Sequence, residues 1–274
     1  MDEQSRKLFI QKTFNTIFEG YECSPLRFFH NAAEKLPILF NFKGDEKVLD
    51  VATGTAIPAL AIAAHLPNGS VTAIDFSEGM LSKAQQKITA LNITNIDLQQ
   101  MDMTAMDLAE NQFDAANSSF GIFFVEDMLS TLQHITSKLK PGGTMITTHF
   151  QHDAFSPLTE KFLNRVAAYG IEIPSPSWKR VATEADNTEL FESAGLVEVN
   201  VESQDIGYFL KNSEEWWAVI WNAGYRGLIA GLEPERLAQF KQEHLAEIET
   251  FQTLKGIRLN VGVIHTKGRR RQSA

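Results

Sequence analysis

The sequence has little cysteine, no long apolar stretch and no excess of basic residues. Cys23 is the single cysteine among 274 residues, which excludes an internal disulfide and is typical of a protein in a reducing cytoplasm. No run of about 18 apolar residues occurs, so no membrane span is expected. The formal net charge of −9 argues against nucleic acid as a partner.

No secretory signal is expected at the N-terminus, and a basic cluster lies near the C-terminus. The opening residues, MDEQSRKLF, lack the basic and then apolar order of a secretory leader. The one basic cluster, Lys267–Arg271, is expected to be a solvated tail. No spacing of His, Cys and carboxylate residues is typical of a metal site, so no metal is predicted.

The most informative stretch is KVLDVATGTAIP, residues 47–58. An apolar run ends in Asp50, small residues follow through Gly54, and Pro58 opens an apolar helical segment. This order predicts a buried strand, a tight turn that a ligand can approach closely, and a helix N-terminus. Dinucleotide enzymes need Gly-x-Gly-x-x-Gly at such a turn, and the run from Ala52 matches it poorly.

S-adenosylmethionine is the other cofactor that suits this turn. It has no pyrophosphate and presents an amino acid end, whose ammonium Asp50 could pair with. The alternative interpretation involves no ligand: the small residues of this turn would only allow the helix to pack closely on the strand.

Apolar strands and amphipathic helices alternate over residues 43–150. Strands are expected at 47–51, 70–74, 96–100, 113–118 and 144–150. The alternation predicts an α/β, Rossmann-like fold with a seven-stranded, mostly parallel sheet and helices on both faces. Polar residues follow four successive strands, namely Asp50, Asp75, Asp102 and the pair Ser118 and Ser119. The carboxyl ends of parallel strands share one edge, so these residues predict a ligand site there.

Three regions are expected along the chain. Residues 1–42 read as an N-terminal helical lid, and residues 43–150 as the cofactor-binding core. Residues 151–274 hold the remainder of the sheet, with strands at 196–203 and 257–265. Between these two strands, at about 205–255, lies a helical insertion rich in aromatic residues, which we expect to form a substrate cap.

The order of motifs resembles class I S-adenosylmethionine-dependent methyltransferases, and within them the ubiquinone/menaquinone-biosynthesis C-methyltransferase branch. The motifs that show this resemblance are VLDVATGT at 48–55, VTAIDFSEGML at 71–81, QMDMTAMDL at 100–108, FDAANSSFGIFFVED at 113–127 and LKPGGTMI at 139–146. The resemblance covers residues 40–150 and implies S-adenosylmethionine as cofactor. Ala52 stands where such families also carry Ala, whereas Ala56 replaces the usual Gly.

The resemblance also implies roles for individual residues. The methionine part of the cofactor would lie on the turn of Asp50, Ala52, Thr53 and Gly54, the ribose hydroxyls on Asp75, and the adenine on Phe76 or Met80. The adenine amino group would lie on Asp102 with Met103 beside it, and the methyl group beside Ser118 and Ser119.

The substrate side departs from the quinone branch. That branch usually has Gly-Leu-Arg-Asn-Val after strand 4, where this chain has Gly121-Ile122-Phe123-Phe124-Val125. Phe123 and Phe124 therefore indicate either an apolar pocket or a buried turn. Tyr21 and Trp217 are candidates for cation–π contact with the methyl sulfonium, or for plain core packing. His149, at the end of the fifth strand, is the candidate general base, against the alternative of a structural histidine.

Three functions remain open on these residues. The first is a methyltransferase that moves a methyl group to O, C or N of a small apolar or aromatic molecule. The second is an NAD(P)-dependent oxidoreductase, and the third is a non-catalytic S-adenosylmethionine-binding protein. A small-molecule methyl acceptor is the predicted partner, and the sequence leaves a homodimer open.

Overall fold

A seven-stranded sheet forms the centre of the protein, which a computed structural model describes over residues 3–272. The strands follow the order β3-β2-β1-β4-β5-β9-β6, with only β9 antiparallel to its neighbours. Their bounds are β1 Lys47–Val51, β2 Ser70–Asp75, β3 Ile96–Gln100, β4 Phe113–Ser119, β5 Leu139–Phe150, β6 Leu196–Asp205 and β9 Gly262–Arg270. The predicted Rossmann-like, mostly parallel sheet is confirmed.

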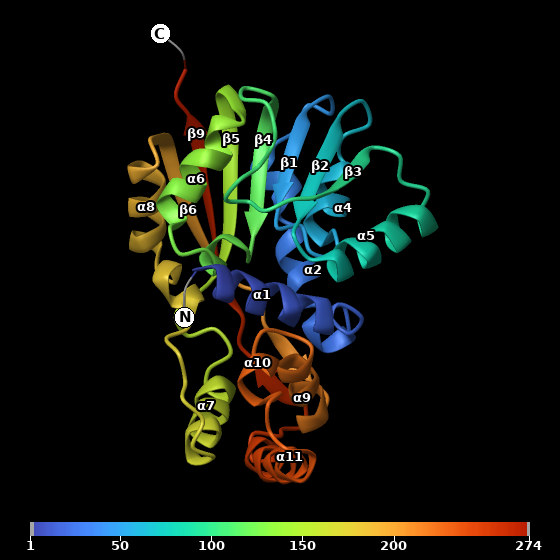
Figure 1. Cartoon of the computed structure of the whole chain (residues 1–274), viewed down its shortest axis with the longest axis vertical. Coiled ribbons are helices and arrows are strands. Elements are labelled where there is room, and N and C mark those ends of the chain that lie inside the picture. Colours follow the sequence, from blue (N-terminus) through green and yellow to red (C-terminus); the bar gives the residue numbers. More distant parts are fainter. Residues whose placement is uncertain (1–2, 273–274) are drawn as a thin grey trace.

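Helices cover both faces of this sheet because its central strands are apolar on both sides (Figure 1). Val48 and Ile146 pack into one core cluster with α4 (Ile57–Ala63) and α5 (Glu78–Ala90). Leu49 and Met145 belong to the other cluster, on the face of α6 (Met128–Ser137) and α8 (Glu184–Ser193). Adjacent residues thus face opposite layers, as the two-residue period of a strand requires.

The sheet ends in one row of loops toward which β1 and β4 point (Figure 1). Parallel pairing places Val51 beside Ile74, Asp75 beside Gln100, and Asp50 beside Asn117. The polar residues that follow each strand therefore lie along one edge, as the alternation predicted.

The N-terminal helices pack on this edge and on one face. Helix α1 (Glu3–Ile17) crosses the strand ends, and α2 (Phe28–Ala33) and α3 (Leu36–Phe40) contact α4. The short 3-10 helix η1 (Ser24–Leu26) connects α1 to α2. On α1, Gln11 donates to the Phe76 carbonyl at 2.8 Å, and Asn15 accepts from the Ser77 hydroxyl at 2.6 Å.

A helical group extends beyond the strand ends (Figure 1). It consists of α7 (Leu158–Ala168), α9 (Ser213–Trp221), α10 (Arg226–Ile229) and α11 (Pro234–Glu249), and α11 packs on α7 and α9. Arg165 on α7 forms ion pairs with Glu243 and Glu247 on α11, and Trp216 donates to His244 at 2.9 Å. Two further 3-10 helices, η2 (Ile122–Phe124) and η3 (Ser177–Val181), pack together on the sheet.

The last expected strand, 257–265, divides in two. Ile257–Leu259 forms β8, which pairs with β7 (Tyr208–Leu210) in a separate two-stranded sheet, and β9 begins at Gly262. The short β7 was not expected from the sequence. It pairs only with β8, so its three residues leave no long alternating pattern to detect.

The expectation of a solvated basic tail is wrong for residues up to Arg270. Lys267, Arg269 and Arg270 lie on β9, an inner strand paired with β5 and β6. Lys267 donates to the carbonyl of Leu39, and Arg270 donates to the carbonyls of Ser137 and Leu139. Long basic side chains can pack their apolar stems while their charged heads reach carbonyl groups, so a basic run does not exclude an inner strand.

Within residues 3–272, no helix combines the length and the apolar character that a bilayer crossing requires.

A glycine on β9 tests this inner position. A Cβ atom at Gly268 would lie 2.9 Å from the Phe191 ring and 3.2 Å from Leu196 Cβ. We expect Gly268→Ala to lower the free energy of unfolding by about 1–3 kcal/mol in urea titration, because overpacking a core costs that much. Gly224→Ala, where a Cβ meets open space, is the control and should stay within about 0.5 kcal/mol of the parent. Equal stability of the two variants would contradict the placement.

Candidate functional site

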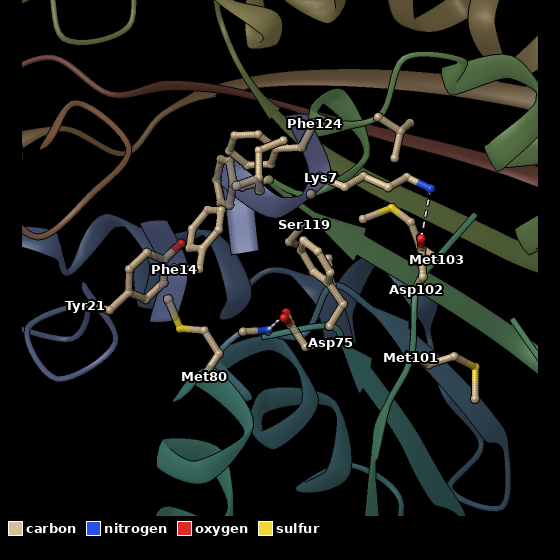
Figure 2. A pocket seen from close by; sticks show the side chains of 17 residues that line it. Lys7, Phe14, Tyr21, Asp75, Met80, Met101, Asp102, Met103, Ser119 and Phe124 are labelled. Atoms are coloured by element: carbon tan, nitrogen blue, oxygen red, sulfur yellow. Dashed lines mark hydrogen bonds and ion pairs between the residues drawn. The ribbon is translucent and has the colours of Figure 1, made fainter. Parts of the chain in front are cut away.

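A cavity lies at the strand ends beneath α1 (Figure 2). It encloses about 760 Å³ of empty space, including the part that opens to solvent. Residues that line it come from α1, from the turn after α1, and from the ends of β1, β2, β3 and β4 with the segments that follow them. They are Lys7, Ile10, Phe14, Tyr21, Ala52, Gly54, Asp75, Phe76, Met80, Met101, Asp102, Met103, Ser119, Phe120, Gly121, Phe124 and Val125.

Asp75 connects two loops on the floor of this cavity. Its Oδ2 accepts from the Gly54 backbone N–H at 2.8 Å, and its Oδ1 accepts from the Ser77 backbone N–H at 2.8 Å. Burial raises the pKa of this carboxyl, against the hydrogen bonds that lower it. Each oxygen keeps a free lone pair, so the side chain can still accept two hydroxyl groups in the cavity.

Asp102 lies further along the edge and is tied to α1. Lys7 Nζ lies 2.9 Å from its Oδ2, and the Thr104 backbone N–H donates to its Oδ1 at 2.8 Å (Figure 2). Partial burial acts to raise the pKa of Asp102, but the hydrogen bonds from Thr104 and Lys7 outweigh it and hold the pKa below its usual range. The carboxylate is therefore ionised at neutral pH, with one lone pair of Oδ2 free for an N–H donor.

The turn after β1 is strained where it meets the cavity. Ala52 and Phe120 have φ values of 57° and 56°, a region that non-glycine residues seldom occupy. A Cβ on Gly121 would lie 2.5 Å from Ala52 Cβ, so the loops after β1 and β4 touch only because this residue is glycine. Strain of this kind persists where the surroundings fix the backbone, and it is common at ligand sites.

Asp50, Thr53 and Ser118 are buried beneath the cavity and do not line it. The Asp50 carboxylate accepts from Thr53 Oγ1 at 2.5 Å and from Asn117 Nδ2 at 2.6 Å. Burial raises the pKa of Asp50 to about 6, although these two hydrogen bonds act to lower it. Asp50 therefore supports the site from below.

The side of the cavity under α1 is aromatic. Phe14 meets Tyr21 and Phe124 edge-on, at ring-centre distances of 6.3 and 5.3 Å, and Tyr21 stacks on Phe29 at 4.6 Å. Burial raises the pKa of Tyr21, so its hydroxyl stays protonated. The wall thus offers π-faces and a single hydroxyl.

Phe124, one of the two Phe residues expected at an apolar pocket or a buried turn, lines the cavity. The sequence argument did not assign the α1 residues Lys7, Ile10 and Phe14, nor Phe120 after β4, to the site. Their signal was present, because Ile10 and Phe14 share one face of a helix. That face packs over the cavity instead of over a core, and no property of the spacing distinguishes the two.

Besides Asp50, Thr53 and Ser118, three further expected residues lie outside the cavity lining. His149 is fully buried on β5, where Nδ1 lies 2.6 Å from Asn187 Oδ1, and burial lowers its pKa to about 4. Phe123 packs against the neighbouring Phe124 and faces the core. Trp217 lies on α9, stacked on Trp221 with ring centres 5.9 Å apart. None of the three is placed to touch a ligand in this cavity.

The described residues bring no three His, Cys, Asp or Glu side chains together in a way that could hold a metal ion.

The segment that forms this edge of the sheet is similar to a methyltransferase domain. Residues 48–143 match the family model described as a methyltransferase domain. The matched segment runs from β1 into β5 and contains the loops after β1, β2, β3 and β4 that line the cavity.

Curated relatives narrow the resemblance. The chain is 32% identical over 149 residues to demethylmenaquinone methyltransferases of Bacillus cytotoxicus and Bacillus cereus. The match takes in 53% of this chain and 63% of the relatives' length. The resemblance to class I S-adenosylmethionine-dependent methyltransferases, and to their quinone-biosynthesis branch, is thereby confirmed.

Solved structures share the fold at low identity. A methyltransferase-like protein from Bacillus halodurans is 20% identical, with a TM-score of 0.58 over 88% of this chain and 100% of that one. The [4+2]-cyclase SpnF is 16% identical, with a TM-score of 0.58 over 89% and 81% of the two chains. A phosphoethanolamine N-methyltransferase of Haemonchus contortus, solved with S-adenosylhomocysteine, is 15% identical, with a TM-score of 0.57 over 94% and 58%.

The buried His149 predicts a pH dependence of stability. Its folded pKa of about 4 lies below the ordinary value of 6.5, so its contribution is present above pH 6.5 and is lost as pH falls toward 4. Between pH 7 and pH 5, we expect His149 to account for about 1–2 kcal/mol of lost stability.

The measurement is chemical denaturation at several pH values. As pH falls from 7 to 5, His149→Phe should lose less of its free energy of unfolding than the parent does. The loss that remains is expected from His244 and His265, whose pKa values are also lowered by burial. His65→Phe, at the exposed end of α4, is the control and should follow the parent. A His149→Phe profile parallel to the parent would refute the assignment.

Proposed function

We propose that this protein is an S-adenosylmethionine-dependent methyltransferase acting on a small apolar or aromatic molecule. One observation carries the proposal: Asp75, Asp102 and Ser119, which lie at or just after the ends of three strands of the sheet, line a single cavity. These residues match the parts of the cofactor. The Asp75 carboxylate suits the two ribose hydroxyls, the Asp102 carboxylate suits the adenine amino group, and the small residues leave room for the chain between them. Fold alone does not fix function, so the weight rests on these side chains.

The order of the strands sets the direction of the bound cofactor. With β3-β2-β1-β4 side by side, adenine would lie at Asp102, ribose at Asp75, and the methionine part at Gly54 and Ser119. Met80 and Phe76 flank the adenosine end, where apolar contact suits a planar base. The methyl group would then face the aromatic wall of Phe14, Tyr21 and Phe124.

The residues supply orientation more than acid–base chemistry. When bound, the sulfonium supplies an already activated methyl group, which passes to an in-line nucleophile as the S–CH₃ bond breaks. The aromatic wall would hold a planar acceptor against this bond and exclude water. Lys7 is the one basic residue in the lining, and it is paired with Asp102.

The N-terminal residues 1–42 would serve as the lid of this site, with α1 as its described part. Helix α1 contributes Lys7, Ile10 and Phe14 to the cavity and hydrogen-bonds to the loop after β2. The helices of residues 205–255 contribute no cavity-lining residue, so their role as a substrate cap would act at the entrance.

The Asp75 carboxylate gives the first test. We expect Asp75→Ala to weaken S-adenosylhomocysteine binding by at least about a hundredfold in calorimetry, because two hydrogen bonds to a charged group are lost. Asp97→Ala is the matched control, since Asp97 is exposed on β3 outside the cavity, and its affinity should equal that of the parent. An unchanged affinity in Asp75→Ala would overturn the proposed site.

Two further measurements separate the alternatives. A screen of aromatic and apolar acceptors with radiolabelled methyl donor should label at least one acceptor, whereas a protein that only binds the cofactor would label none. A fluorescence titration with NADH should show no saturable binding, and saturation would favour the oxidoreductase.

The lid predicts protection on ligand binding. With S-adenosylhomocysteine at about 100 times its Kd, amide exchange over residues 3–17 should slow by up to about a hundredfold, because binding stabilises the closed state by that factor. Exchange in α11, which lines no part of the cavity, is the internal reference. Equal exchange of α1 with and without ligand would contradict a lid.

A further inference from the structure

A ladder of buried polar side chains crosses four strands beneath the cavity. It runs from Asp50 on β1 through Asn117 and Ser119 on β4 and Thr148 on β5 to His265 on β9. Register explains it, since Asp50 pairs with Asn117, Ser119 with Thr148, and Thr148 with His265. All members except Ser119 are buried, and Ser119 lines the cavity.

The contacts along the ladder are continuous. Asn117 Nδ2 donates to Asp50 Oδ1 at 2.6 Å, and Ser119 Oγ donates to Asn117 Oδ1 at 3.2 Å. Thr148 Oγ1 lies 3.3 Å from Ser119 Oγ and 3.0 Å from His265 Nδ1. His265 Nε2 has no hydrogen-bond partner among the described residues.

The proton order along this ladder follows from its Asp50 end. An ionised Asp50 only accepts, so the Asn117 amide must point its N–H₂ group there and its oxygen at Ser119. Ser119 Oγ is placed to donate both to Asn117 Oδ1 and to Thr148 Oγ1, but it has a single proton. If that proton goes to Asn117, Thr148 has to supply the proton of the 3.3 Å contact with Ser119. Thr148 Oγ1 in turn accepts from His265 Nδ1–H. In the reverse order, Ser119 would donate to Thr148 and Thr148 to His265 Nδ1. This order would bury an unpaired Nε2–H on His265 and an unpaired amide oxygen on Asn117, each at a cost of about 1–3 kcal/mol.

The state of the imidazole agrees with this order. Burial first, and Lys35 second, lower the pKa of His265 to about 4. The ring is therefore neutral at pH 7 and carries a single N–H, which Thr148 fixes on Nδ1. The bare Nε2 accounts for the unpartnered buried nitrogen.

From this order we infer that Thr148 and His265 are positioning residues. Asn117 holds the Ser119 proton away from the cavity, and Thr148, fixed by His265, occupies one lone pair of Ser119, so that the remaining lone pair faces the cavity and accepts the ammonium of the cofactor's amino acid end. The sequence suggested Asp50 for this pairing, but Asp50 does not reach the cavity. Ser119 lies at the cavity end of the hydrogen-bond network that runs from Asp50 through Asn117. Each hydrogen bond polarises the next, which strengthens the Ser119 oxygen as an acceptor. The inference rests on the proposed function, because it takes S-adenosylmethionine as the ligand.

Two ligands test it by calorimetry. S-adenosylhomocysteine has the amino acid end, whereas 5′-methylthioadenosine has the adenosine and sulfur without it. Ser119→Ala should weaken S-adenosylhomocysteine by about tenfold, since a hydrogen bond to a charged group is lost, and should leave 5′-methylthioadenosine unchanged. Thr148→Val and His265→Leu should show the same selective loss, on the order of threefold.

The ladder supplies matched controls. Thr148→Ser keeps the hydroxyl and His265→Asn keeps a donor near Nδ1, so both should bind S-adenosylhomocysteine like the parent. Thr147→Val makes the same change one residue away, at a buried hydroxyl with no partner among the described residues, and should also bind normally. Circular dichroism and thermal midpoints confirm that each variant is folded.

A spectroscopic measurement reads the tautomer directly. In ¹⁵N NMR of the full chain at pH 7, with His265 assigned by its absence in His265→Asn, Nδ1 should be protonated and Nε2 bare. Thr148→Val should shift the ring toward a mixture of tautomers, which loss of packing alone would not cause.

The outcomes separate this inference from the proposed function. Selective loss for S-adenosylhomocysteine together with the Nδ1–H tautomer supports it. Equal losses for both ligands, an unchanged Ser119→Ala, or an Nε2–H tautomer would overturn it while the methyltransferase proposal stands. No binding of either ligand by the parent would remove the proposed function itself.

Discussion

The carboxylate of Asp75 holds the floor of the site together. Its two oxygens accept backbone N–H groups from Gly54, in the turn after β1, and from Ser77, at the start of α5. Two loops that come from neighbouring strands are thereby fixed against each other, and the strained turn at Ala52 is fixed with them. The same side chain keeps one lone pair on each oxygen for a ligand, so one buried charge both shapes the site and binds in it.

The Asp75 carboxylate is buried close to the Asp50 carboxylate, and a cationic ligand can offset the electrostatic cost of placing the two together. Burial raises the pKa of Asp50 to about 6, and the nearby Asp75 adds to the effect. A folded pKa above the ordinary value means that Asp50 contributes most to stability when protonated, and that this contribution is lost as pH rises through about 6. A positive group near Ser119 would favour the ionised form, so ligand binding and relief of this cost are linked.

The sequence predicted the strands and helices whose apolar residues recur at a regular short spacing. The strands Lys47–Val51 and Ile96–Gln100 were found to the residue, although the first is buried and the second lies at the edge of the sheet. Asp75, Asp102 and Ser119 were placed at one edge because parallel strands end together. The failures have long-range causes. Whether Ile10 and Phe14 face a core or a cavity depends on the loops after the strands, and whether Lys267 is in a tail or an inner strand depends on its pairing with β5 and β6. His149 was chosen for its position at a strand end, but its side chain faces Asn187, and only packing decides between the two faces of a strand.

The fold alone leaves the reaction open, since a [4+2]-cyclase and methyltransferases share it at similar TM-scores. What distinguishes this chain is the contrast between the two ends of its cavity. The carboxylates of Asp75 and Asp102 line the part at the ends of β2 and β3, and the Ser119 hydroxyl lies at the end of β4, whereas rings from α1 and η2 line the other part. A ligand that spans both must be polar at one end and must present its reactive centre to an apolar wall without a titratable base. Such a site suits a reaction in which the cofactor supplies the chemical driving force and the protein supplies alignment and a dry surface.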